Sequence, residues 1–360
     1  MTASASDSFD LTDLGWDDEW AATLAAATQL LGDAPPGRVA RIDLGACTLL
    51  TARGSLRATI PPGVSLAVGD WVLVRPPATP TDAPVVDGAL PRRTAIVRRA
   101  AGDDPRGQTM AANVDTVLVL VAADGRVTAR SVERYVTVIW ESGATPVIVL
   151  TKTDLVSGAD LDEAVRRLEP ACAGVALHSI STQTGAGLDD LAPYFGPGRT
   201  VALLGSSGAG KSTLANHLAG ANLATGEVRD DGRGRHTTTH RELVPLPAGG
   251  VLVDTPGLRE IGLWEADDGV ARTFPEITAV IGQCRFTDCS HQREPGCALL
   301  EAVGDGRITE ERLASWRNLR GELDRLAARD DPAVRNQPRS EQRRVQRDHG
   351  QAGKQGRKPK

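Results

Sequence analysis

The sequence predicts a multidomain protein with a small N-terminal β-barrel, a central α/β domain that carries a phosphate-binding loop, and a mainly helical, metal-binding C-terminal domain. Three observations carry this prediction. Short β-type runs fill residues 37–96, apolar runs alternate with helical stretches from Val114 onward, and three cysteines lie beside a histidine in residues 284–297. The first pattern is typical of small barrels, the second of parallel sheets covered on both faces, and the third of structural metal sites.

Composition places the chain among ordinary globular proteins. Its 360 residues suffice for two or three domains, and 41% hydrophobic with 24% charged residues is a usual balance. The longest apolar run, residues 117–122, is too short to span a membrane, and residues 1–7 lack the features of a signal peptide. We therefore expect a cytoplasmic protein without membrane association, and we expect a monomer. The net charge of −5 argues against nucleic-acid binding by the whole surface but allows local basic patches.

The N-terminal part begins with an acidic stretch, and residues 19–27 predict a short helix that ends before Gly32. We expect this segment to be an appendage of the barrel. The barrel itself is predicted from five short runs separated by turn residues: 38–42, 47–51, 56–60, 71–74 and 84–86. This pattern suits an OB-type barrel, which commonly binds oligonucleotides, and it also fits an SH3-like or other small barrel with only a packing role.

Residues 91–99 form a basic segment after the barrel, with Arg92, Arg93, Arg98 and Arg99. We interpret it as a loop. Contact with RNA phosphates and a merely solvated surface are equally good interpretations of its charge.

The central domain is predicted from strands at residues 114–121, 146–150, 174–178 and 201–204, with helical stretches between them. Ligands of such sheets bind at the carboxyl ends of the strands, so the motifs are expected there.

A phosphate-binding loop follows the strand 201–204 and matches the pattern G-x-x-x-x-G-K-[ST]. Its backbone N–H groups would surround phosphate oxygens, Lys211 would reach the β- and γ-phosphates, and the Ser212 hydroxyl would ligate Mg²⁺. The loop comprises Gly205, Ser206, Ser207, Gly208, Ala209, Gly210, Lys211, Ser212 and Thr213.

Two further motifs predict recognition of guanine. Thr151, Lys152 and Asp154 follow the strand 146–150, where a carboxylate can accept hydrogen bonds from both the N1–H and the amino group of guanine. Ser181 and Thr182 follow the next strand, where a backbone N–H can donate to the guanine O6.

Two segments after the phosphate loop are predicted to sense the γ-phosphate. Residues 230–239 are polar and Gly-rich, and the Thr238 hydroxyl is expected to complete the Mg²⁺ shell and to act in catalysis. The strand 250–253 delivers Asp254, which is expected on Mg²⁺ or close to it, and Gly257, whose N–H would face the γ-phosphate.

The base-recognition motifs precede the phosphate loop, and the two γ-phosphate-sensing segments, the switches of a GTPase, follow it. This order resembles the RsgA/YjeQ family of circularly permuted, small-ribosomal-subunit-dependent GTPases. The resemblance covers residues 37–327. It implies hydrolysis of GTP to GDP and phosphate, stimulated by the small ribosomal subunit, binding to the rRNA of that subunit, and a role in its late maturation.

Two positions depart from the usual GTPase pattern. Thr151 stands where Asn is usual, and its shorter side chain is expected to weaken contacts with guanine and with the phosphate loop. Leu258 stands where small GTPases place a water-orienting Gln, as it does in the family, so intrinsic hydrolysis is expected to be slow. The resembling proteins carry a histidine before the switch threonines, and we hypothesise that His236 orients or deprotonates the water. An exposed loop histidine is the alternative.

The cysteine cluster has the form C-x4-C-x-H-x5-C and predicts one structural zinc ion, with unbound reduced cysteines as the alternative. Its residues are Cys284, Cys289, His291 and Cys297. Cys47 and Cys172 are expected to be small buried side chains. Because residue 257 leads directly into this region, we hypothesise that loss of the γ-phosphate shifts the zinc domain.

The remaining residues predict a helix from Thr309, with Leu313, Trp316 and Leu319 at helical spacing, followed by a disordered basic tail from about Asp330. The tail is an arm for RNA phosphates or a solubilising segment. The predicted division is 1–36, 37–100, 101–275, 276–329 and 330–360. Two other functions stay open: an ATP-using phosphotransferase and a non-hydrolysing RNA-binding scaffold.

Overall fold

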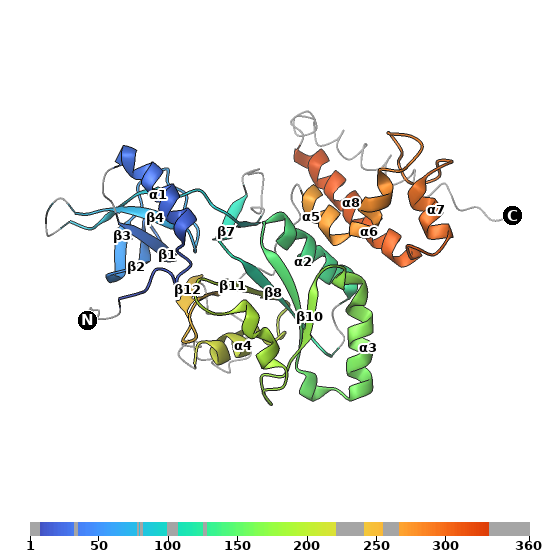
Figure 1. Cartoon of the computed structure of the whole chain (residues 1–360), viewed down its shortest axis with the longest axis horizontal. Helices are drawn as coiled ribbons and strands as arrows, with labels where there is room; N and C mark the ends of the chain where they lie inside the picture. The colour runs from blue at the N-terminus through green and yellow to red at the C-terminus, as the bar shows by residue number, and fades with distance from the viewer. Residues whose placement is uncertain are drawn as a thin grey trace, which may run out of the picture.

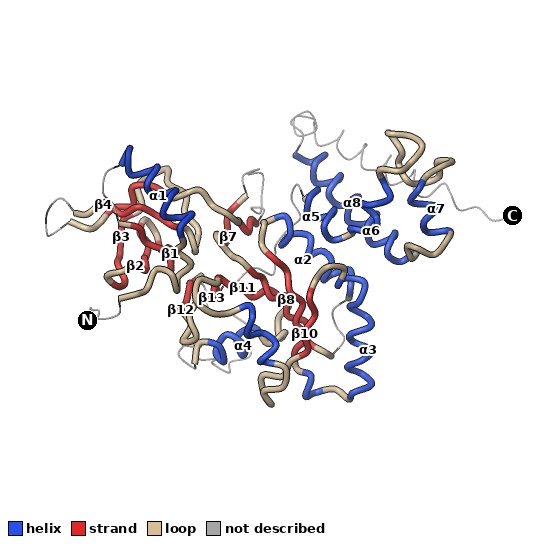
Figure 2. Tube along the Cα trace, viewed as in Figure 1, coloured by secondary structure: helices blue, strands red, loops and turns tan. Residues whose placement is uncertain are grey.

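The computed structural model describes residues 8–31, 35–77, 79, 82–98, 107–124, 128–220, 241–254 and 266–330. Figure 1 shows a barrel, a central sheet with its helices, and a C-terminal helical body arranged along the long axis. Strands build the barrel and the central domain, whereas the described part of the C-terminal body contains helices and loops (Figure 2). The predicted fold class is confirmed.

Five strands form the barrel: β1 (Pro36–Asp43), β2 (Ala46–Thr51), β3 (Gly54–Thr59), β4 (Trp71–Arg75) and β5 (Val85–Ala89). Antiparallel pairing joins β1 to β2 and β4, β2 to β3, and β4 to β5, and a parallel pair between β3 and β5 closes the ring. Val39, Leu49, Val72 and Val86 are fully buried inside it. A closed ring of five strands in this order agrees with the OB-type prediction.

The N-terminal segment is part of the core. Leu14 is 1% exposed, and Trp20 in α1 (Asp18–Leu31) is 3% exposed. The Trp16 ring meets the Trp71 ring edge-on at 4.7 Å between centroids and stacks near Trp20 at 6.4 Å. The expectation of an appendage is therefore wrong, because these indoles pack the segment onto the barrel.

The basic segment after the barrel contains a strand, β6 (Ala95–Arg98), which pairs antiparallel with β7 (Gln108–Ala112). Arg92 binds the buried Asp70 through Nε at 2.7 Å and Nη2 at 2.8 Å. Arg93 binds Asp17 at 2.6 and 2.7 Å and lies 4.3 Å over the Trp20 ring. The interpretation as a loop is thus corrected, and these two guanidinium groups bind carboxylates of the chain itself.

The central sheet has the parallel order β10-β9-β8-β11-β13, and β12 pairs antiparallel with β13. The strands are β8 (Thr116–Ala122), β9 (Thr145–Thr151), β10 (Ala176–Ser179), β11 (Thr200–Gly205), β12 (Glu242–Pro245) and β13 (Val251–Asp254). β12 also pairs with β1 at Arg41 and Glu242, so barrel and central sheet form one eleven-stranded sheet.

Helices cover both faces of the central sheet. Val117 and Val119 of β8 share a core with α2 (Ala129–Glu141) and α3 (Gly158–Leu168), whereas Leu118 and Leu120 share one with α4 (Lys211–Leu218). Neighbouring side chains of a strand point to opposite faces, so a strand apolar at every position is buried on both. Short 3-10 helices follow β9, α3 and β10: η1 (Thr153–Leu155), η2 (Glu169–Cys172) and η3 (Leu188–Tyr194).

The C-terminal body consists of α5 (Asp267–Thr273), α6 (Pro275–Ile281), α7 (Ala298–Gly304) and α8 (Glu310–Asp330). It rests on α2, where the Thr137 and Thr273 hydroxyls are 2.9 Å apart and the Gly269 N–H donates to Glu141 at 2.8 Å. Arg312 of α8 lies between Glu133 at 2.6 Å and Glu276 at 2.5 Å. The helix predicted from Thr309 is confirmed, and among the described helices none is long and apolar enough to cross a membrane.

Candidate functional site

The phosphate loop joins β11, which lies between β8 and β13, to the start of α4. Three of its glycines have positive φ angles: 150° at Gly205, 77° at Gly208 and 88° at Gly210. A Cβ atom at Gly205 would lie 2.4 Å from the Leu120 carbonyl oxygen, so only glycine fits there. The first turn of α4 leaves its backbone N–H groups without helical partners, and Ser212 and Thr213 of this turn are exposed.

Lys211 lies over the loop. Its Nζ donates to the Gly205 and Ser206 carbonyl oxygens, each at 2.7 Å. The ammonium group is thus held beside the backbone that the motif assigns to phosphate binding.

Thr151 connects the predicted base-recognition loop to the phosphate loop. Its side chain is buried, and its hydroxyl donates to the Ala209 carbonyl oxygen at 2.8 Å. The Val121 carbonyl oxygen lies 3.3 Å from the same hydroxyl. The shorter side chain of Thr151 therefore still reaches the phosphate loop.

Asp154 and Ser181 come from neighbouring strand ends. Lys152 has a φ of 60°, which turns the chain after β9 and starts η1 with Asp154 in it. The Ser181 hydroxyl donates to Asp154 Oδ1 at 2.5 Å and accepts from the Thr184 N–H at 3.2 Å. Ser181 is fully buried and Asp154 is exposed, so a hydroxyl in the protein interior orients a carboxylate that faces solvent.

These residues all follow the carboxyl ends of parallel strands. Thr151 to Asp154 follow β9, Ser181 and Thr182 follow β10, the phosphate loop follows β11, and the backbone of Asp254 ends β13. The structure brings these motifs to one edge of the sheet, as parallel topology requires. The Asp254 side chain and the predicted residues His236, Thr238, Gly257 and Leu258 lie outside the described residues.

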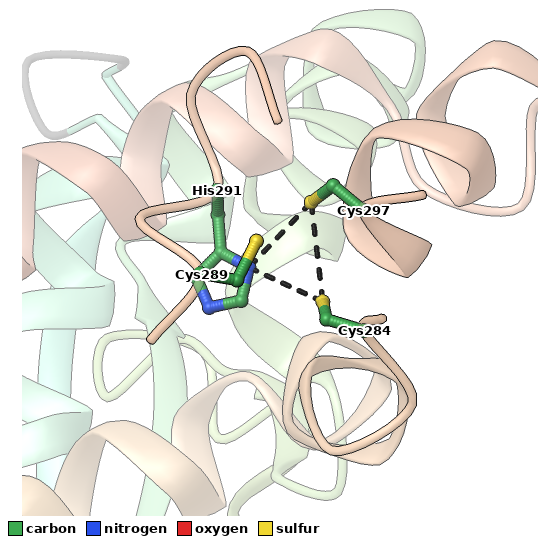
Figure 3. A group of neighbouring side chains, drawn as sticks. All are labelled: Cys284, Cys289, His291 and Cys297. Carbon is green, nitrogen blue, oxygen red and sulfur yellow. Dashed lines mark hydrogen bonds between the residues drawn. The ribbon is translucent and has the colours of Figure 1, made fainter. Parts of the chain in front are cut away.

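Four potential metal ligands converge between α6 and α7. Their ligand atoms all lie within 4.8 Å of one another, and the side chains point toward a common centre (Figure 3). His291 Nδ1 is 3.5 Å from Cys284 Sγ and 3.6 Å from Cys297 Sγ, and the two sulfurs are 4.0 Å apart. Tetrahedral zinc with usual bond lengths requires about 3.8 Å between sulfurs and about 3.5 Å between sulfur and nitrogen. The set, completed by Cys289, fits such an ion.

The surroundings of the cluster hold His291 in place. Its φ is 58°, and its carbonyl oxygen accepts from Arg317 at 2.5 Å. Its ring meets Trp316 of α8 edge-on at 5.9 Å. Because Arg317 and Trp316 belong to α8, the cluster ties that helix to the loop.

The other two cysteines lie outside the cluster. Cys47 is buried in the barrel, and Cys172 is half-buried and donates to the Leu168 carbonyl oxygen at 3.2 Å. Burial raises the pKa of each thiol to about 11. The prediction of a small buried side chain is confirmed for Cys47, whereas Cys172 is only half-buried.

Comparison with known proteins identifies relatives of the whole chain. Residues 89–264 match the family model described as RsgA GTPase. The chain is 46% identical to the Small ribosomal subunit biogenesis GTPase RsgA of Streptomyces coelicolor, over 95% of this chain and 94% of the relative. It is 44% identical to the protein of the same name from Opitutus terrae, over 93% and 95% of the two chains.

Solved structures share the fold. The crystal structure of YjeQ from Thermotoga maritima matches with a TM-score of 0.63 and 26% identity, over 81% of this chain and 99% of that chain. YloQ, described as a circularly permuted GTPase, matches with a TM-score of 0.60 and 22% identity, over 81% and 96%. Together with the motifs gathered at one edge of the sheet, the family model and the sequence relatives show that the chain belongs to the RsgA family of GTPases and is a GTP hydrolase.

Proposed function

We propose that this GTPase binds the small ribosomal subunit and its rRNA, hydrolyses GTP faster when bound there, and acts in late maturation of that subunit. The observation that carries the proposal is the hydrogen bond from Thr151 to Ala209, which links the base-recognition loop to the phosphate loop. Within the base-recognition motifs, the Ser181 hydroxyl binds Asp154. The relatives whose names refer to small-subunit biogenesis support the partner.

Guanine is recognised by the loops after β9 and β10. Asp154 accepts hydrogen bonds from the base N1–H and amino group, Lys152 lies along the base, and a backbone N–H near Thr182 donates to O6. Adenine offers that carboxylate no matching pair of donors, and a carboxylate that the bound base covers without hydrogen-bonding it is costly. The Ser181 hydroxyl keeps the carboxylate in position.

The triphosphate is held by the N–H groups of residues 205–213, and Lys211 exchanges the two loop carbonyls for phosphate oxygens. Ser212, Thr238 and Asp254 would hold the Mg²⁺ that is bound with GTP, and the ion would neutralise charge on the phosphates. Gly257 contacts the γ-phosphate. Of these, the roles of Thr238, Gly257 and the Asp254 side chain are proposed from the sequence alone.

The attacking water is positioned by His236, since Leu258 offers no polar atom. In this proposal His236 acts when the small subunit is bound, and this accounts for stimulation. The zinc ion is structural, because four protein ligands leave no open position for substrate.

We propose that the protein acts as a cytoplasmic monomer without membrane association. Its RNA contacts lie on the OB-type barrel, on the zinc body and on the basic residues 330–360. The divisions 1–36, 37–100, 101–275, 276–329 and 330–360 remain our proposal for the domain limits.

The decisive experiment measures GTP hydrolysis by the purified protein alone, with small ribosomal subunits and with large subunits. Strong stimulation by small subunits only is the expected result. Equal slow hydrolysis in all three mixtures would contradict the proposed partner. Competition by unlabelled GTP but not ATP tests base recognition in the same assay, and a His236→Ala variant should lose stimulation while it keeps its affinity for GTP.

A further inference from the structure

A cavity of about 340 Å³ lies where the N-terminal segment, the barrel and the central sheet meet. Its lining includes Asp115, just before β8, and Thr200, the first residue of β11. These are the amino ends of parallel strands, whereas the predicted GTP site lies at their carboxyl ends. The cavity is therefore separate from the nucleotide site, and none of the nucleotide-binding motifs above uses it.

Indole rings form one wall of the cavity. The chain has six tryptophans and only 3% aromatic residues, yet Trp16, Trp20 and Trp71 all line this one space. Trp71 is fully buried and Trp20 nearly so, whereas Trp16 is half-buried. The wall thus combines a rigid base with one aromatic ring that remains accessible for stacking.

A buried guanidinium group forms the floor. Arg38 is 1% exposed, and among the described residues no carboxylate lies within ion-pair distance of it. Its nitrogens donate instead to neutral oxygens of Leu14, Gly69, Asn113 (3.0 Å) and Thr200 (2.9 Å). Burial lowers its pKa to about 10, which leaves it charged at neutral pH. The floor therefore carries a positive charge without a direct ion pair, and the carboxylates of Asp115 and Asp70 act on it from farther away.

The rim supplies a second cation and hydrogen-bond acceptors. Arg199 is exposed, and none of the described carboxylates pairs with it. Arg93 is already bound by Asp17 and Glu19. Asp115 accepts the Thr200 N–H at 2.7 Å through one oxygen, and its exposed carboxylate can also accept from amino groups of a ligand.

An accessible indole, a cation at the rim and a polar floor match the chemistry of a nucleotide in unpaired RNA. Proteins recognise such nucleotides by stacking the base on aromatic rings and by contacting its phosphate with arginine. The volume is at the low end of the range of about 300–1,000 Å³ for ligand sites, which suits a single nucleotide.

We propose that this cavity binds one nucleotide of single-stranded RNA, with the base stacked on Trp16 and the phosphate on Arg199. The inference rests on the proposed function, in that RNA is the partner, and it adds a defined subsite at the junction of barrel and sheet. An RNA held there contacts both bodies at once, because Arg38 and Trp71 belong to the barrel and Thr200 to the sheet.

The test uses the full-length protein and a fluorescently labelled single-stranded RNA hexamer, with affinity measured by anisotropy. Arg199→Glu and Trp16→Leu should each weaken binding about 10- to 100-fold. Arg166→Glu is the matched control, since Arg166 is an exposed arginine of α3 that pairs with Glu163 and lies outside the lining of the cavity; it should leave the affinity unchanged. Basal GTP hydrolysis should be the same in all variants. Arg199→Glu is a surface change, so it keeps the test valid if Trp16→Leu does not fold.

A hexamer that contains 4-thiouridine locates the contact. Photo-crosslinks to peptides that contain Trp16 or Arg199 are expected. Unchanged affinity in both variants, or crosslinks only outside the cavity, would overturn the proposal. A free nucleoside monophosphate that competes as tightly as the hexamer would also overturn it and identify a small-molecule site. Hexamer binding is measured without ribosomes, so absence of subunit-stimulated hydrolysis would contradict the proposed function and leave this inference standing.

Discussion

The hydroxyl of Thr151 donates a 2.8 Å hydrogen bond to the carbonyl oxygen of Ala209, 58 residues later in the chain. This bond joins the end of β9 to the loop after β11. A nucleotide bound at this edge contacts both segments, with its base near the first and its phosphates on the second. The bond thus holds the two halves of the site at a fixed separation.

Thr151→Val should weaken GTP binding about 5- to 150-fold. Valine keeps the shape and the burial of the side chain but leaves the Ala209 carbonyl without its donor, which costs about 1–3 kcal/mol. Titration with a fluorescent GTP analogue measures the effect. Thr153→Val is the control, because the hydrogen bond found for Thr153 uses its backbone N–H, to Ile180. Equal affinity of the two variants would contradict the role of Thr151.

Ser181→Ala should reduce GTP affinity about 10-fold or more, since hydrogen bonds to charged groups contribute about 1.5–3 kcal/mol. The effect should pass through Asp154. In an Asp154→Asn background, which already loses guanine recognition, the serine change should therefore add little. The GTP affinities of the wild type, both single variants and the double variant form a double-mutant cycle that measures this coupling. Strictly additive losses would show that Ser181 acts independently of Asp154.

Zinc removal should expose three thiols. With zinc bound, alkylation at pH 8 should spare Cys284, Cys289 and Cys297, and a strong chelator should make all three reactive. Cys47 and Cys172 should stay slow while the protein is folded, because a pKa of about 11 leaves about one thiol in a thousand ionised at pH 8. Mass spectrometry of the alkylated peptides gives the pattern. Loss of one zinc equivalent from Cys297→Ser but not from Cys172→Ala completes the test.

Glu133→Gln should destabilise the junction between α2 and the C-terminal body by about 3 kcal/mol, because Arg312 stays buried and loses one of its two carboxylates. Glu322→Gln breaks the more exposed pair with Arg134 and should cost under about 1 kcal/mol. Urea unfolding measures both. Similar midpoints for the two variants would mean that the buried pair contributes no more than a surface pair.

Acid should remove the contribution of the Asp17 carboxylate to the stability of the fold. Its hydrogen bonds with Arg93 lower its pKa from 3.8 to about 2. A carboxyl group whose pKa is lower in the folded state stabilises the fold fully above pH 4–5, and the stabilisation is lost as the pH falls through 3.8 toward 2. Asp17→Asn should therefore be less stable than the wild type at pH 7, by under about 1 kcal/mol because the carboxylate is half-exposed, and the difference should shrink by pH 2.5. A difference that is constant from pH 7 to 2.5 would contradict this origin.

The local pattern of the sequence predicted most of the fold. The five barrel strands begin and end within three residues of the predicted runs, because apolar residues and turn residues alternate there at short range. The buried strands of the central sheet were predicted for a similar reason, since each is apolar at nearly every position. The edge at which the motifs gather followed from parallel topology alone.

Contacts between distant residues were not predicted. Arg38 is a charged residue of a barrel strand, yet it is buried because the N-terminal segment and Thr200, 162 residues away, cover it. Arg92 and Arg93 read as free surface charge because their partners Asp70 and Asp17 lie 22 and 76 residues away. In the site, the sequence placed Asp154 and Ser181 at one edge of the sheet. Only the folded chain shows that the Ser181 hydroxyl donates a hydrogen bond to the Asp154 carboxylate.

The pairing of β12 with β1 at Glu242 and Arg41 makes the barrel a continuation of the central sheet. β12 is the first described strand after residues 221–240, the segment that holds His236 and Thr238, and α5 is the first described helix after residues 255–265, the segment that holds Gly257. One segment therefore leads into the strand that touches the barrel, and the other into the helix fastened to α2 at Gly269. If both segments respond to the γ-phosphate, one hydrolysis event changes two contacts, one at the barrel and one at the C-terminal helical body. A mutation can then block either change and leave the other intact.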